Sequence, residues 1–184
     1  MDVSLHTERL VLRPLAPDDM PAIVDGLNDF EVTRYLTRVQ HPYTLADANE
    51  WLGMLKPPVP GAAHFAIDLG GHGLVGVVGI ETELGYWLDR RFHGLGLMTE
   101  ACAALLDWHF AAHPGDLVPS GAHAGNEASL NVQRKLGFVV WPGLQMRFVR
   151  SQGRDIPHIP TTLSRVDFEA ARSKLSRLRS RSWT

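Results

Sequence analysis

One stretch of this sequence constrains the fold more than any other. Residues 83–108 read as a strand, a glycine-containing loop and a helix in direct succession. The strand, Glu83 to Leu88, carries two neighbouring aromatic residues, which strands favour. The helix is indicated by apolar residues that share one helical face: Leu97, Ala101, Ala104, Leu105 and Trp108. The fold must therefore bring a strand, through a flexible loop, directly to the N-terminus of a helix.

The loop itself predicts a binding site for a pyrophosphate. Arg91, Gly94 and Gly96 form an Arg-x-x-Gly-x-Gly pattern just before the helix. Unpaired N–H groups at a helix start attract anions, and glycines allow a close approach to the backbone. The dinucleotide fingerprint needs a glycine where Thr99 stands, and the Gly-Lys-Ser/Thr of NTPase loops is absent. For so short a motif, a glycine turn leading into a core helix is the alternative.

The remaining pattern predicts one α+β (mixed α/β) domain, because antiparallel hairpins are combined with two helical crossovers. Further strands are expected at 10–14, 64–69, 74–80, 117–122, 138–141, 145–150 and 156–163. Further helices are expected from an N-cap at Asp18 to Leu27, at 31–36, from a capping box at Thr44 and Asp47 to Leu55, and from Asn126 to a stop at Gly137. We expect the domain to span residues 1–170, followed by a basic tail at 171–184.

Composition narrows the class of protein. The 184 residues are 45% hydrophobic, which suits one domain with a substantial core. A formal net charge of -2 does not favour general nucleic-acid binding. No apolar stretch is long enough to span a membrane, and the N-terminus lacks the pattern of a secretion signal. Cys102 is the sole cysteine, so a reducing, cytoplasmic location is expected.

Five stretches, in this order and spacing, resemble the GNAT superfamily of N-acetyltransferases: residues 7–13, 31–36, 83–88, 91–101 and 126–138. The similarity is closest to the branch that acetylates the N-termini of ribosomal proteins. The resemblance implies a twisted mixed sheet of about seven strands, in which two central strands splay apart to admit the cofactor. It also implies acetyl-CoA as co-substrate without a metal, and direct attack by an amine on the thioester.

The resemblance also implies which residues bind the coenzyme. They are Trp87, Leu88, Arg91, Phe92, His93, Gly94, Leu95, Gly96, Leu97, Met98, Thr99, Asn126 and Ser129. Some of these have simpler explanations. Asn126 can be a plain N-cap, and His93 an ordinary loop residue without phosphate contact.

Glu83 and Ser129 are the expected catalytic residues. Glu83 would take the proton of the amine, with Glu81 as an alternative on the same strand face. A backbone N–H near Trp87 or Leu88 would stabilise the oxyanion. Many members of the superfamily protonate the leaving thiolate with a tyrosine at the position of Gln133, and in the resembling branch a serine at the position of Ser129 does so. The simpler alternatives are a solvated carboxylate at Glu83 and a capping serine at Ser129.

Two further hypotheses compete with an acetyltransferase acting on a protein N-terminus or a small amine. The chain could be a non-catalytic acyl-CoA sensor, which Gln133 favours, or an enzyme for a larger acyl group such as succinyl. A homodimer through the C-terminal strands is expected from the resemblance alone. The nine histidines show no metal-ligand clustering. The basic residues of the tail favour a solvated helix end over docking to RNA or the ribosome: Arg172, Lys174, Arg177, Arg179 and Arg181.

Overall fold

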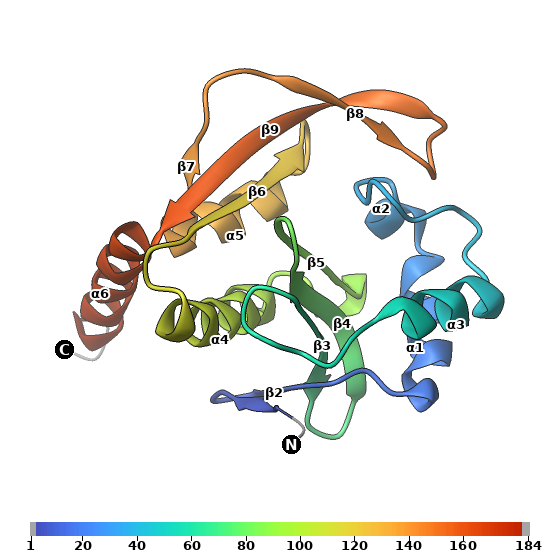
Figure 1. Cartoon of the computed structure of the whole chain (residues 1–184), viewed down its shortest axis with the longest axis horizontal. Coiled ribbons are helices and arrows are strands. Elements are labelled where there is room, and N and C mark those ends of the chain that lie inside the picture. The colour runs from blue at the N-terminus through green and yellow to red at the C-terminus, as the bar shows by residue number, and fades with distance from the viewer. Residues whose placement is uncertain (1–2, 182–184) are drawn as a thin grey trace.

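The computed structural model describes the chain from residue 3 to residue 181, with side chains to residue 174. The first sheet lies between the helix Leu97–Ala112 (α4) on one side and the helices Met20–Leu27 (α1) and Leu45–Met54 (α3) on the other, and the second sheet stands above it with the helix Glu127–Leu136 (α5) against it (Figure 1). The expected α+β class and single-domain organisation are confirmed.

The first sheet contains the N-terminal half of the chain. Its strands follow one another in space as they do in sequence, and every neighbouring pair is antiparallel. They are β1 (Leu5–His6), β2 (Leu10–Arg13), β3 (Ala63–Leu69), β4 (Gly73–Ile80) and β5 (Leu84–Leu88). β5 is therefore an edge strand of this sheet.

The second sheet is built on one long strand, β9 (Arg154–Ser164). Three shorter strands pair with β9 in antiparallel fashion: β6 (Leu117–His123), β7 (Val139–Val140) and β8 (Gln145–Val149). Pro157 and Pro160 are accommodated within β9, as the sequence interpretation allowed.

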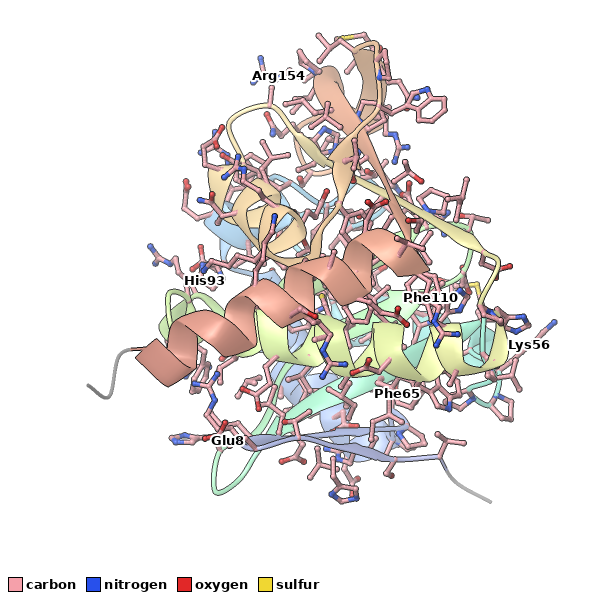
Figure 2. All side chains as sticks on the ribbon, turned by 90° about the vertical axis from the view of Figure 1, so that its left-hand side faces the viewer. Glu8, Lys56, Phe65, His93, Phe110 and Arg154 are labelled. Carbon is pink, nitrogen blue, oxygen red and sulfur yellow. The ribbon has the colours of Figure 1, made fainter. Side chains whose placement is uncertain are left out.

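Helices connect and cover the two sheets. The N-terminal group is η1 (Pro17–Asp19), α1 (Met20–Leu27), α2 (Phe30–Thr33) and α3 (Leu45–Met54). The other helices are η2 (Arg90–Phe92), α4 (Leu97–Ala112), α5 (Glu127–Leu136) and α6 (Arg165–Arg181). Figure 2 looks onto α6 and α4, with Phe110 on α4 and Phe65 of β3 beneath it in the core. A second cluster packs α1 and α3 against the opposite face of the first sheet.

The sheet differs from the expectation in one respect. About seven strands in one mixed sheet were expected, whereas the described residues form nine strands in two antiparallel sheets. The division falls between β5 and β6, where the central strands were expected to splay. Here the Ser120 side chain donates to the Leu84 carbonyl at 2.9 Å, and no backbone ladder is formed. The splayed central strands are thus the boundary between the sheets.

Two local expectations need correction or extension. Asp18 is not the N-cap expected for the first helix, because Asp19 holds that position and a 3-10 turn precedes α1. Asp19 also binds Arg13 and the Ala16 N–H, and these contacts draw its carboxylate inward. At the other end, α6 continues to residue 181 through the start of the expected tail at 171. Arg177, Arg179 and Arg181 lie outside the described side chains, so the proposed role of the basic tail stays a prediction.

The described residues contain neither a membrane-spanning helix nor a metal-binding cluster. Between residues 3 and 181, no helix has the length and apolarity needed to cross a membrane. In the same part of the chain, no group of three or more His, Cys, Asp or Glu side chains is arranged to hold a metal ion.

Candidate active site

The glycine loop delivers the chain to the N-terminus of α4 in the conformation that its glycines permit. Gly94 and Gly96 both have a φ of +78°, which side chains with a Cβ rarely adopt, and Gly96 is the N-cap of α4. A Cβ on Gly94 would have no other atom within 4 Å, so the space beside the loop is open. The first N–H groups of a helix have no intrahelical partner, and they carry the positive end of its dipole. The geometry fits an anionic guest here.

Side chains around the loop hold it in place. His93, labelled in Figure 2 beside the start of α4, lies with Nε2 2.8 Å from the Leu88 carbonyl oxygen. Arg91 is engaged by carboxylates, because it pairs with Asp89 and, at 3.1 Å, with Asp25. Its hydrogen bonds hold the pKa of Asp89 below the usual range. A contact between Arg91 and phosphate stays a prediction. A bound phosphate would have to compete with Asp89 and Asp25 for the Arg91 guanidinium.

The N-terminal stretch at residues 7–13 also holds the glycine loop in place. Glu100, in the first turn of α4, accepts hydrogen bonds from the Thr7 hydroxyl at 2.6 Å and from Arg9 Nε at 2.7 Å. Burial would raise the pKa of Glu100, but these hydrogen bonds outweigh burial and hold that pKa below its usual range. Arg9 also donates to the Leu95 carbonyl at 2.9 Å, so the opening segment fixes the loop from outside.

The edge of β5 presents backbone groups to the gap between the sheets. The Leu84 carbonyl binds Ser120 of β6, and the Leu88 carbonyl binds the ring of His93. Alternate residues of a strand direct their backbone groups to the same side, so Tyr86, between these two, also faces β6. The backbone groups of Trp87 face β4 instead, on the same side as the Asp89 N–H, which donates to the Val75 carbonyl of β4 at 2.8 Å. Of the two expected oxyanion donors, Leu88 therefore has its N–H on the side of the gap.

A polar cluster joins β5 to α5 at the far end of this edge. The Asn126 side chain caps α5 by accepting from the Ser129 N–H at 3.2 Å, as the sequence predicts. Ser129 Oγ lies 2.9 Å from the Tyr86 hydroxyl and accepts from Gln133 Nε2 at 3.2 Å. Gln133 is buried and also accepts from the Thr161 hydroxyl at 2.7 Å. Ser129 is thus part of a buried network as well as of the helix cap.

Glu83 lies on the other side of the gap and carries an ion pair. Both of its carboxylate oxygens lie 2.9 Å from Arg147 Nη1 of β8. His123 and His158 pack nearby with ring centroids 5.2 Å apart. Burial, followed by the charge of Arg147, lowers the pKa of His158 to about 4. Glu83 is therefore ion-paired with Arg147 and lies near two neutral imidazole rings.

These groups line a cavity of about 830 Å³ between the sheets and α3. Tyr86, Ser129, Glu83 and Trp87 line it, together with the α2–α3 loop from Tyr35 to Gln40. Glu81 lies at the same cavity, where its carboxylate is 3.8 Å from His64 Nδ1. The structure brings the two expected catalytic residues to one cavity, while the glycine loop lies at the opposite end of β5.

Sequence reasoning missed three contributors to this site. Tyr86 and Thr161 complete the network around Ser129, and Arg147 neutralises Glu83. Thr161 and Arg147 are contributed by the C-terminal hairpin, whose register with the central strands no local pattern reveals. Tyr86 stands inside the quoted motif, and only its side chain direction was unknown.

Comparison with known proteins identifies the family. A model of the acetyltransferase (GNAT) domain family matches residues 9–139, so the chain belongs to this family. Transfer of an acyl group to an amine is the general activity of the family. The resemblance stated from the five sequence stretches is therefore confirmed.

Three relatives illustrate the similarity. "Putative ribosomal N-acetyltransferase YdaF" of Bacillus subtilis is 36% identical over 59 residues, which is 32% of either chain. "Uncharacterized N-acetyltransferase p20" of Bacillus licheniformis is 26% identical over 163 residues, covering 82% of this chain and 90% of p20. The ribosomal-protein-S5-alanine acetyltransferase structure from Vibrio fischeri has a TM-score of 0.68 at 24% identity, covering 91% of this chain and 99% of that one.

Proposed function

We propose that this chain transfers an acetyl group from acetyl-CoA to an amine by direct attack in a ternary complex. One observation carries the proposal: the edge of β5 leads from the N-terminus of α4 to the cavity that Glu83 and Ser129 line. An extended pantetheine arm with its amides would lie along such an edge as a further strand does.

Different residues along the gap would bind different parts of the coenzyme. The α4 N-terminus with Gly94 and Gly96 would receive the pyrophosphate, and Arg91 could add a charge if released from Asp25. The backbone of Tyr86 and Leu88 would hold the arm. The remaining predicted contacts follow from their place on the loop and first turn: Phe92, His93, Leu95, Leu97, Met98 and Thr99.

The chemistry requires a proton acceptor and a proton donor. Glu83 is the proposed acceptor, and an arriving amine would have to compete with Arg147 for its carboxylate. Ser129 is the proposed donor to the leaving thiolate. The Leu88 N–H would face the developing oxyanion.

The acceptor we propose is a protein N-terminus. The names of YdaF and of the Vibrio fischeri enzyme, which refer to ribosomal proteins, support this class. A cavity of about 830 Å³ can admit the end of a peptide chain, as well as a small amine or a larger acyl group.

A panel assay tests the proposal. Acetyl-CoA, succinyl-CoA and free CoA are incubated with peptides bearing a free N-terminal serine or alanine and with small amines, and product mass is measured alongside CoA release. We expect an acetylated amine and one released CoA for each transfer. Coenzyme binding without acyl transfer to any amine would instead support the non-catalytic sensor that Gln133 suggests.

A further inference from the structure

Tyr86 brings a phenol to the one residue that is proposed to protonate the thiolate. Its hydroxyl lies 2.9 Å from Ser129 Oγ and 3.2 Å from the Ser129 carbonyl oxygen, and Gln133 Nε2 is 3.4 Å away. The ring packs against the main core, while the residue also lines the cavity. Many members of the superfamily carry a tyrosine at the position of Gln133. Here a tyrosine from β5 reaches the side chain of Gln133 instead.

The Gln133 amide fixes the direction of some hydrogen bonds around Ser129. Thr161 Oγ1 donates to Gln133 Oε1 at 2.7 Å, which fixes the amide so that Nε2 faces Ser129 Oγ and the Gly121 carbonyl. An amide nitrogen is a donor only, so Ser129 Oγ accepts from Gln133. When Tyr86 also donates to Ser129 Oγ, both lone pairs of that oxygen are occupied. The hydroxyl proton of Ser129 is then left to point at a ligand in the gap.

We propose that Tyr86 is the positioning residue of a two-step proton donor, in which Tyr86 donates to Ser129 and Ser129 donates to the sulfur of CoA. This inference rests on the proposed acyl transfer. As the carbon–sulfur bond breaks, sulfur keeps the electron pair and takes the Ser129 proton. Ser129 regains a proton from Tyr86, and water reprotonates Tyr86 after the products leave. The amine proton goes to the base and from there to water, which offsets the proton that Tyr86 takes from water, so a thioester and an amine give an amide and a thiol.

The surroundings of Tyr86 keep its phenol neutral. Burial raises the pKa of its hydroxyl, so Tyr86 stays protonated and can hold its hydrogen bond to Ser129. Cys102 of α4 is a neighbouring titratable group, and burial raises the pKa of its thiol as well.

Kinetics with the amine identified by the panel give the first test. General acid catalysis contributes about 100-fold or more in rate, and Tyr86→Phe removes only the part that depends on Tyr86 while Ser129 remains. We expect Tyr86→Phe to lower kcat by at least about tenfold, with the KM for acetyl-CoA little changed. The double variant with Ser129→Ala should be no slower than the slower single variant, because both residues serve one transfer. Multiplying losses, or an unchanged kcat for Tyr86→Phe, would overturn the relay.

A second measurement needs no acceptor. Free CoA is bound to the protein, and its thiolate absorbance is followed against pH relative to the unliganded protein. A donor aimed at sulfur stabilises the thiolate and lowers the pKa of the bound thiol. In Tyr86→Phe and in Ser129→Ala we expect that pKa to rise by about one unit. Tyr43→Phe is the matched control, since Tyr43 is a buried tyrosine that also lines the cavity and packs with α1 and α3.

The outcomes separate the two proposals. Bound CoA whose thiol pKa is the same in wild type, Tyr86→Phe and Ser129→Ala contradicts the relay and leaves acyl transfer standing. A folded wild-type protein that does not bind CoA overturns both. A rise of the thiol pKa in Tyr43→Phe equal to that in Tyr86→Phe also contradicts the relay, because the effect would not depend on contact with Ser129.

Discussion

Single residues in this site act through their neighbours more than through their own position in the sequence. Gln133 looked like the loss of an acid, yet its amide orients Ser129 and contacts the hydroxyl of Tyr86. Glu83 was expected to be a base, with a solvated carboxylate as the alternative, and in the structure Arg147 hydrogen-bonds to both of its oxygens. The residue types were readable from the sequence, whereas these partners are contributed by other elements.

The histidine pair gives the protein a predicted acid sensitivity. His158 has its pKa lowered to about 4 from an ordinary 6.5, first by burial and then by Arg147 and His123, while Glu83 acts in the opposite direction. Below pH 6.5 the unfolded chain binds a proton that folded His158 resists until about pH 4, so the stability of the fold falls across that window. We expect His158→Gln to flatten the dependence of the unfolding free energy on pH between these values.

Denaturant unfolding at intervals across the same pH range checks this expectation. His6→Gln is the control, because His6 is exposed on β1. A His158→Gln variant that loses stability on acidification as steeply as the wild type would show that His158 does not contribute.

At the scale of elements, strong local signals were sufficient for most of the fold. The Thr44 and Asp47 capping box, the Asn126 cap and the stop at Gly137 all stand where the sequence predicts them. At Gly137 the φ is +95°, and a Cβ would lie 2.6 Å from the Asp167 carbonyl oxygen, so glycine is required twice over. Asp18 was misjudged because tertiary contacts with Arg13 give the cap position to Asp19.

The splay of β5 and β6 could not be read from residue patterns and came only from family resemblance. β6 pairs along its whole length with β9, which lies about 40 residues later in the chain, and no local pattern in β6 indicates that partner. The site follows the same rule: the glycine loop is local and predictable, while the cluster of Tyr86, Ser129 and Thr161 joins residues from three elements.

At the scale of the whole molecule, the second sheet exposes an apolar surface that supports the proposed homodimer. Its members are 53–63% exposed: Val139, Val140, Trp141, Leu144, Met146 and Phe148. Exposed apolar groups of this extent mark interaction sites on many proteins. We expect Met146→Asp combined with Phe148→Asp to give a monomer in sedimentation velocity, with the fold retained by circular dichroism.

The control for the dimer is Val166→Asp, because Val166 is 75% exposed on α6. That variant should sediment like the wild type. A wild-type protein that is monomeric at all concentrations would contradict the dimer.

The central claim is that acyl-CoA enters between the two sheets with its pyrophosphate at the N-terminus of α4. The most direct test is calorimetric titration of CoA into wild type and Gly96→Val, with Gly70→Val as the control in an exposed turn where a Cβ meets nothing within 4 Å. A valine at a φ of +78° would displace the loop and obstruct the helix N-terminus. We expect Gly96→Val to weaken CoA binding at least about tenfold, or 1.4 kcal/mol, while the control matches the wild type. A folded Gly96→Val protein that binds CoA with wild-type affinity would contradict the claim.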